Sequence, residues 1–312
     1  MNRTILVTIS TAILFTVASC SNTSKQADKQ TVKMIAVKHK LGKTEVPVSP
    51  KKILVFDMGT LETLSDLGIS VAGIPKDFVP AHLKEYKADP NVKDVGSILQ
   101  PNLEKVSAMN PDLVIISSLH ANDYEQLSKI APTISLGVES DHYKSSVIKN
   151  LNTIGEVFDI KEKTNQKVAD IENKIEEAAK VIAASPKKIM VLLYNAGSFS
   201  SFGSKSRYSF VFSDLKAKTA DDSKVSDIHG TVVSSEYISH VNPDILYIID
   251  RNLIMEGHKL NKSEVENALV QKTDAFKNKR IYYLDPNIWY LSGGGTYSIK
   301  HMITDVLQGY KL

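Results

Sequence analysis

Short apolar runs and amphipathic stretches alternate along most of the chain. Residues 53–56 and 113–116 are continuous in Val, Ile, Leu and Phe, which is typical of strands buried on both faces. Between such runs, apolar residues recur at helical spacing, as at Leu61, Leu64 and Leu67 before a stop at Gly68. This alternation predicts an α/β fold with a largely parallel sheet.

The same pattern gives approximate bounds for the elements. Residues 32–39 and 45–47 flank a turn that contains glycine and predict a hairpin. Helices are expected after Asp57, from Asn102, and at 123–130, 145–158, 208–215 and 298–308. Strands are expected at 53–56, 71–74, 92–95, 113–116, 133–136, 189–194, 245–249 and 281–284.

Residues 161–185 form a different kind of segment. Apolar residues recur there at helical spacing among Lys and Glu, with no Gly or Pro inside, and Pro186 follows. This predicts one long helix, before and after which the strand–helix alternation runs independently. We therefore expect an N-terminal lobe at 32–158, a connecting helix at 159–186 and a C-terminal lobe at 187–312. A cleft between two lobes is the usual place for a ligand, and a stiff connector would limit closure.

An internal repeat supports the division into two lobes. Residues 102–116 begin Asn-Leu-Glu, and residues 234–248 begin Ser-Ser-Glu. Both continue through a predicted helix to Asn-Pro-Asp and an apolar strand, so Glu104 and Glu236 each stand seven positions before the proline. The proline ends each helix and turns the chain into the sheet.

The N-terminus has the features of an export signal. Arg3 precedes a short apolar run, and small residues stand directly before Cys20. This resembles the lipobox of bacterial lipoproteins, with a signal peptide at 1–19, a lipid-modified Cys20 and a polar tether over 20–31. The alternative is an ordinary signal peptide with an incidental cysteine. We expect a protein that is lipid-anchored to the outer face of the cell membrane.

Composition excludes several classes of site. Cys20 is the only cysteine, so intrachain disulfides and Cys-rich zinc or iron–sulfur sites are excluded. The net charge is +3 and the lysines are scattered among acids, so nothing indicates a nucleic-acid partner. Catalytic motifs and a phosphate loop are missing, which favours a binding protein without a cofactor over an enzyme. We read residues 197–206 as a cleft loop in which Lys205 adds positive charge.

Several segments together resemble one family. Residues 50–68, the repeat at 102–116, and C-terminal segments at 229–230, 234–237, 250–252 and 284–291 are similar to those of substrate-binding lipoproteins of bacterial ABC importers. The resemblance is closest to the ferric-siderophore group with two lobes and a backbone helix, and to its ferric catecholate, petrobactin-type members. It covers essentially the whole mature chain. It implies a monomer that captures a ferric siderophore and delivers it to an ABC permease.

The resemblance also implies roles for particular residues. His229 and Tyr290 match iron ligands that complete the coordination of a four-donor siderophore, while simple packing is the alternative for each. Arg207 and Arg251 match positions that neutralise an anionic ferric complex. Trp289 would line or back the site, unless it only packs in the core.

Two further positions match docking residues of the family, and one segment differs from the family pattern. Glu104 and Glu236 match glutamates that face arginines of the permease, with favourable helix N-terminal charge as the alternative. The family commonly has a third arginine after the strand at 113–116, where this chain has Ser-Ser-Leu-His instead. His120 then has either a ligand-binding role or a local structural one. Two other functions stay open: a receptor for a bare transition metal, and a surface-anchored enzyme or adhesin.

Overall fold

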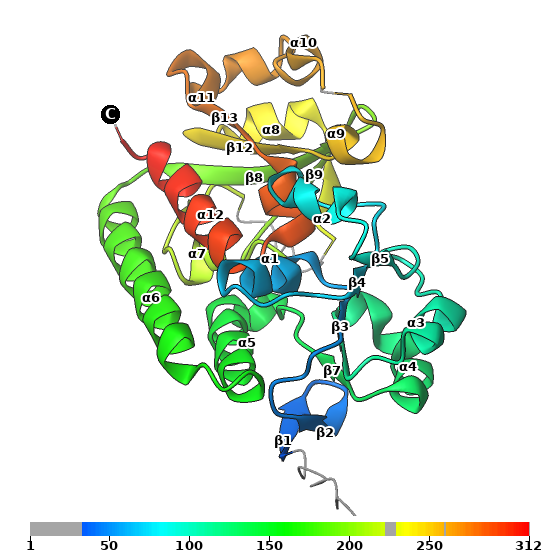
Figure 1. The fold of residues 1–312 in the computed structure, drawn as a ribbon. Helices are drawn as coiled ribbons and strands as arrows, with labels where there is room; N and C mark the ends of the chain where they lie inside the picture. Colours follow the sequence, from blue (N-terminus) through cyan, green and yellow to red (C-terminus); the bar gives the residue numbers. More distant parts are fainter. Residues whose placement is uncertain (1–32, 222–228, 259, 312) are drawn as a thin grey trace, which may run out of the picture. The chain divides into compact units, whose positions relative to one another are not determined.

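The computed structural model describes residues 33–221, 229–258 and 260–311 (Figure 1). Contacts group the chain from Lys33 onward into one unit. The predicted signal peptide, Cys20 and the whole predicted tether lie outside the described residues and stay predictions. Within the described part, no helix is both long and apolar enough to cross a membrane.

The N-terminal lobe is built on a five-stranded sheet whose neighbouring strands are all parallel. Its order is β5-β4-β3-β6-β7. The central strands β3 and β6 are buried on both faces, which explains their continuous apolar sequence. The bounds are β3 (Ile53–Val55), β4 (Gly73–Ile74), β5 (Lys93–Asp94), β6 (Leu113–Ile116) and β7 (Thr133–Ser135).

A hairpin precedes this sheet, as predicted. Strands β1 (Met34–His39) and β2 (Gly42–Pro47) pair antiparallel. Thr44 Oγ1 donates a hydrogen bond of 2.9 Å to the carbonyl of Thr133, which attaches the hairpin to β7. The helices of this lobe are α1 (Met58–Asp66), α2 (Lys84–Ala88), α3 (Leu103–Met109), α4 (Tyr124–Ile130) and α5 (Tyr143–Val157), with 3₁₀ turns η1 (Ala81–Leu83), η2 (Ser118–Asp123) and η3 (Ser140–His142).

The C-terminal lobe has a six-stranded mixed sheet. Its order is β11-β9-β8-β12-β13, and β10 pairs with the start of β8. Strands β8, β12 and β13 are parallel, whereas β9 runs antiparallel to β8 and β11. The bounds are β8 (Lys188–Asn195), β9 (Ser198–Phe202), β10 (Lys218–Thr219), β11 (Thr231–Val233), β12 (Ile245–Asp250) and β13 (Ile281–Leu284).

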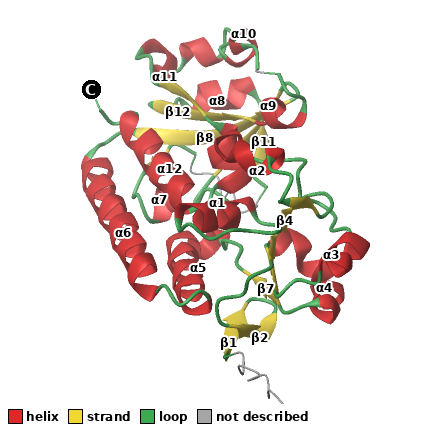
Figure 2. Cartoon of the chain, viewed as in Figure 1, coloured by secondary structure: helices red, strands yellow, loops and turns green. Residues whose placement is uncertain are grey.

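Short helices surround this second sheet. They are α7 (Phe210–Ser213), α8 (Ser235–Val241), α9 (Arg251–Met255), α10 (Lys262–Val265), η4 (Val270–Lys272) and α11 (Asp274–Lys277). A six-residue π-helical turn, η5 (Asn287–Ser292), follows β13 and leads into α12 (Thr296–Gln308). Figure 2 shows the strands of the two sheets in separate regions, with helices around each of them.

The long helix α6 (Lys161–Ala184) confirms the predicted connector. Its buried face joins α5, α12 and the C-terminal sheet in one hydrophobic core, and Figure 1 shows it running beside α5 and α12. The N-terminal end of α5 contributes Tyr143 and Val147 to that core, whereas its last turn packs under the N-terminal sheet. The α/β fold with two lobes and a backbone helix is therefore confirmed.

The sequence repeat is also a repeat of hydrogen bonds. Helices α3 and α8 both end at an asparagine in the left-handed region, Asn110 (φ 46°) and Asn242 (φ 49°). The following aspartates then cap the neighbouring strand: Asp112 accepts from the backbone of Lys51 and Lys52, and Asp244 from that of Lys188, each at 2.8 Å. Asn-Pro-Asp therefore ends a helix and fixes the strand beside it.

Two predictions in the C-terminal lobe need correction. Residues 198–202 are strand β9, so the segment 197–206 is not simply a cleft loop. Phe199 and Phe202 of this strand pack in different hydrophobic cores. Ala196 and Gly197 have the positive φ angles (47° and 81°) that a tight hairpin turn requires. The helix expected at 208–215 is confined to Phe210–Ser213, with hydrogen-bonded turns on either side.

Candidate functional site

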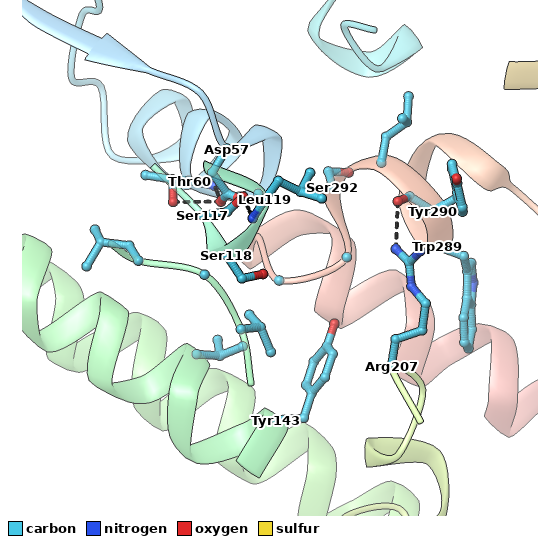
Figure 3. Close-up of a pocket in the computed structure, with 18 of the residues that line it drawn as sticks. Asp57, Thr60, Ser117, Ser118, Leu119, Tyr143, Arg207, Trp289, Tyr290 and Ser292 are labelled. Atoms are coloured by element: carbon cyan, nitrogen blue, oxygen red, sulfur yellow. Dashed lines mark hydrogen bonds between the residues drawn. The ribbon is translucent and has the colours of Figure 1, made fainter. Parts of the chain in front are cut away.

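A cavity of about 370 Å³ lies where the carboxyl ends of strands from both lobes meet. Its wall includes Asp57 after β3, Ser117 after β6, Gly137 after β7, and Arg251 after β12. Crevices at the carboxyl ends of parallel strands are the usual ligand sites of open α/β sheets. Figure 3 shows this pocket, with α5 on one side and η5 on the other.

Tyr290 stands at the centre of the C-terminal side of this cavity. Arg251 Nε donates to its phenolic oxygen at 2.8 Å. Arg207 Nη2 donates to its carbonyl oxygen at 2.9 Å, as Figure 3 shows. The guanidinium carbon of Arg207 lies 4.8 Å from the centre of the Tyr290 ring, and that of Arg251 lies 5.6 Å from it. Asn195 at the end of β8 accepts a further bond of 2.8 Å from Arg251. Two positive charges thus converge on one phenol.

The local structure explains how these groups meet. Asp250 caps α9 by accepting from the backbone of Asn252, which starts the helix at Arg251. Tyr290 lies in the π-helical turn η5, a rare geometry found frequently at functional sites. His229 lines the same cavity. The structure therefore brings Arg207, Arg251, His229 and Tyr290 to one site.

Trp289 backs the cavity from within the core. It is almost fully buried, its ring lies against Tyr208 and Phe210, and its Nε1 donates to Asp305 at 2.8 Å. Burial raises the pKa of that carboxyl, and the Trp289 hydrogen bond lowers it in part. Trp289 also forms part of the cavity wall, so it both packs in the core and contributes to the site.

The N-terminal side of the cavity has a different chemistry. Apart from Asp57 and Asn150, its described lining residues are apolar or hydroxyl-bearing, and none is Lys or Arg. The one acid among them, Asp57, accepts from the backbone and side chain of Thr60 at 2.7 and 2.8 Å and caps α1. Burial raises the pKa of Asp57, and its hydrogen bonds oppose that shift. The positive groups of the site are thus confined to its C-terminal side.

Tyr143 and Asp57 are cavity residues that sequence analysis missed as site candidates. Tyr143 points from α5 into the pocket, and burial raises its pKa above the usual range (Figure 3). Asp57 was predicted only as part of a helix-capping turn. Their positions in the sequence could have indicated both residues. Asp57 follows the strand β3, and Tyr143 begins the helix α5, at the carboxyl edge of the sheet.

His120 and Lys205 stand apart from the cavity. His120 is fully buried behind the wall, with its ring 5.3 Å from that of Phe56, and neither ring nitrogen has a hydrogen-bond partner among the described residues. Burial lowers its pKa, which the Ile98 backbone, Asp123 and Asp57 offset in part. Lys205 is exposed in a turn and is not one of the described lining residues. Neither side chain is part of the described cavity lining.

Glu104 and Glu236 occupy equivalent places in the two lobes. Each is the second residue of its helix, α3 or α8, and each is exposed. Asn102 and Ser234 cap the two helices by accepting from the backbone three residues later. The Ser234 side chain lowers the pKa of Glu236. The two acids therefore stand on matching helix starts, outside the cavity.

The glycines at 293–295 form a close backbone contact, here called the seam, with Gly59 of α1. A β-carbon on Gly59 of α1 would meet the carbonyl oxygen of Ser292 at 2.7 Å, and one on Gly295 would meet the carbonyl oxygen of Gly59 at 2.8 Å. The two backbones therefore approach each other at a distance that excludes side chains. Gly59, Gly293 and Gly294 all line the cavity, so this seam between lobes is part of its floor.

The described residues contain no group of three or more His, Cys, Asp or Glu side chains placed to hold a metal ion. A bare metal would therefore lack a set of ligands in this part of the chain.

The model of the family described as "Periplasmic binding protein" matches residues 53–288. The chain belongs to this family. A ferric-anguibactin-binding protein of Vibrio anguillarum is 38% identical over 316 residues, with 98% of each chain covered. A petrobactin-binding protein of Bacillus subtilis is 39% identical over 309 residues, covering 98% of this chain and 97% of its own.

A solved structure of the same family agrees with the fold. It is a siderophore-binding protein bound to a complex of two acinetobactin molecules and ferric iron. It is 38% identical, has a TM-score of 0.84, and the match covers 90% of this chain and 99% of the other. The predicted resemblance to siderophore-binding members of the family is thereby confirmed. These relatives are binding proteins rather than enzymes.

Proposed function

We propose that this protein captures a ferric siderophore, of catecholate type, and presents it to an ABC importer for iron uptake. The observation that carries the proposal is Tyr290, whose ring centre lies 4.8 Å and 5.6 Å from the guanidinium carbons of Arg207 and Arg251 in the cavity wall. Its phenolic oxygen accepts a hydrogen bond from Arg251. The names of the relatives support it, since they bind ferric anguibactin, petrobactin and ferric acinetobactin.

The charges suit an anionic iron complex. Catecholate oxygens carry negative charge, and Arg207 and Arg251 offer planar donors that pair with such oxygens and stack on rings. Ferric iron favours six ligands, so a four-donor siderophore leaves two positions open. We assign these to Tyr290 and His229, which line the same cavity. The bond from Arg251 leaves the Tyr290 oxygen with a lone pair for the metal.

The test is titration of the purified mature protein with a four-donor ferric catecholate. We expect quenching of the Trp289 emission, because this single tryptophan forms part of the cavity wall. Tyr290→Phe and His229→Ala should each shift the charge-transfer band of the bound complex. An unchanged emission across a panel of ferric siderophores would contradict the function. Unchanged bands in both variants would contradict iron ligation alone.

Two other functions receive less support. A receptor for bare metal would need converging His and carboxylate ligands, and the described residues provide no such cluster. Such a receptor would respond to Mn²⁺ or Zn²⁺ alone, which the same titration includes as a control. An enzyme or adhesin on this scaffold has no supporting group in the cavity beyond those already assigned to binding.

We further propose that Glu104 and Glu236 dock the protein on the permease. They are exposed, equivalent, and placed one in each lobe, so they present two negative points to one partner. In cells, Glu104→Ala and Glu236→Ala should each reduce iron uptake severalfold, because interfacial charge pairs contribute to association. Binding of the ferric complex by the purified variants should stay unchanged.

A matched control exists on α4. Glu125 is also an exposed second residue of its helix, but it has no counterpart in the other lobe. Glu125→Ala should therefore leave uptake at the wild-type level. If all three variants behave alike, or if the docking variants lose ligand binding, the docking role is wrong.

Lipid attachment at Cys20 would place this receptor beside the permease without a membrane-spanning helix. The proposal is supported by the residues before Cys20 and by the family, whose members act outside the cytoplasm. Detergent-phase partition of the mature protein tests it: recovery in the aqueous phase would contradict an anchor.

A further inference from the structure

Three large apolar side chains at the cavity are open to solvent. Leu99 is 67% exposed, Leu119 61% and Met255 43%, and all three line the cavity. A lining residue that solvent also reaches lies at the rim, so these side chains surround the opening. A single exposed leucine is ordinary on a protein surface, whereas apolar groups gathered around one opening mark a contact surface.

The leucines are held in these positions by polar interactions. Leu99 lies in a turn closed by reciprocal backbone hydrogen bonds between Ser97 and Gln100 (3.0 and 3.1 Å). Asp77 fixes this turn by accepting from Ser97 Oγ at 2.7 Å and from the Ile98 backbone at 3.1 Å. The rim is therefore preorganised, which lowers the entropic cost of binding against it.

Leu119 reaches the rim from the opposite strand end. It lies in the first turn of η2, which begins after Ser117. The Ser117 side chain caps that turn by accepting a hydrogen bond from the Leu119 backbone. Figure 3 shows Leu119 on the side of the pocket formed by the N-terminal lobe, facing the segment that carries Ser292. The position of the Leu119 side chain is therefore determined by the backbone of the cavity wall.

The apolar rim continues into the cationic side. Helix α9 carries Arg251 at its first position and Met255 four residues later, which places both on one face of the helix. The N-terminal side offers no Lys or Arg among its described lining residues. One end of the cavity is therefore cationic, with Arg207 and Arg251, and the rim across from it is apolar.

We propose that the cavity selects amphipathic ferric siderophores, whose anionic chelating groups meet Arg207 and Arg251 while an apolar linker lies against Leu99, Leu119 and Met255. This rests on the proposed function and specifies its ligand class. A polar linker would lose water at the rim without gaining hydrogen bonds there. Leu99, Leu119 and Met255 are then determinants of specificity rather than of iron binding.

The test uses two synthetic ferric bis-catecholates with identical chelating groups and linkers of equal length. One linker is polymethylene and the other is an oligo(ethylene glycol). Wild-type protein should bind the polymethylene complex about tenfold more tightly, as expected from burial of a few methylene groups. The double variant Leu99→Asn, Leu119→Asn should lose this preference, so that its dissociation constants for the two complexes agree within about twofold.

Val181→Thr is the control. Val181 is also a large exposed apolar residue (50%), but it lies on α6 and is not among the described lining residues. This variant should keep the wild-type preference, and thermal unfolding checks that all variants fold. If the wild type binds both complexes equally, or if the double variant keeps the preference, the inference about the linker is wrong. The proposed function is not affected by either result. If the wild type binds neither complex nor any other ferric siderophore, the proposed function fails and the inference fails with it.

Discussion

Replacing Glu62 with alanine is expected to lower the free energy of unfolding by roughly 3 kcal/mol. Glu62 is 2% exposed, and its carboxylate accepts from the backbone and side chain of Ser298 at 2.7 and 2.6 Å. His82 Nε2 lies 2.6 Å from the same carboxylate. The alanine variant leaves these buried or half-buried groups without their acceptor, and each costs about 1 kcal/mol or more. Urea unfolding followed by circular dichroism measures the loss.

The position of Glu62 explains why the effect should be large. It belongs to α1 in the N-terminal lobe, whereas Ser298 is in the first turn of α12, whose backbone N–H groups have no partner within the helix and attract an anion. Asp66, one turn along α1, accepts from Thr296 Oγ1 at 2.8 Å. Helix α1 thus caps α12 across the glycine seam. Because that seam is the cavity floor, the variant should also bind ligand more weakly.

Two controls separate this role from a general effect of lost charge. Glu62→Gln keeps the volume and one acceptor oxygen, so it should lose less stability than the alanine variant. Glu177→Ala removes an exposed glutamate from α6 and should change stability by less than about 0.5 kcal/mol. A loss below about 1 kcal/mol for Glu62→Ala would mean that the seam does not depend on this carboxylate.

The seam also shows where sequence reasoning stopped. Apolar runs and helical spacing predicted β3, β6, β12 and the long helix α6, since each depends on its own segment. The approach of Gly59 to Gly295 depends on two segments far apart in the chain, so neither segment by itself predicts it. Strand β9 was missed for a related reason: its Ser and Phe pattern is short, and its pairing with β8 supplies the rest.

Part of the candidate site was also predictable from the sequence, and part was not. Arg207, Arg251, His229 and Tyr290 were predicted from resemblance, and the structure gathers them in one cavity. Lys205 was predicted from the loop at 197–206, and His120 from the position where the family commonly has an arginine. Neither pattern fixes the direction in which the side chain points. The 3₁₀ turn after β6 turns Leu119 outward and His120 into the core, so the apolar rim could not be read from the sequence.

Arg251→Ala should weaken binding of an anionic ferric siderophore roughly 100-fold, because a hydrogen bond to a charged group contributes about 1.5–3 kcal/mol. Arg251 also positions Tyr290, since its Nε bonds the phenolic oxygen while Asn195 holds Nη1. Arg251→Lys keeps the charge but cannot make both bonds in the same geometry, so it should recover only part of the affinity. Fluorescence titration of Trp289 gives the dissociation constants.

Arg280→Ala is the matched control, since Arg280 is in the same lobe and outside the described cavity lining, and it should bind as the wild type does. Arg207→Ala should cost a similar factor, because Arg207 holds the carbonyl of Tyr290 and lies over its ring. The double variant should lose less than the product of the two single losses, since both arginines act on one tyrosine. Strict additivity would show that the two guanidinium groups contact the ligand independently and that Tyr290 is not positioned by them.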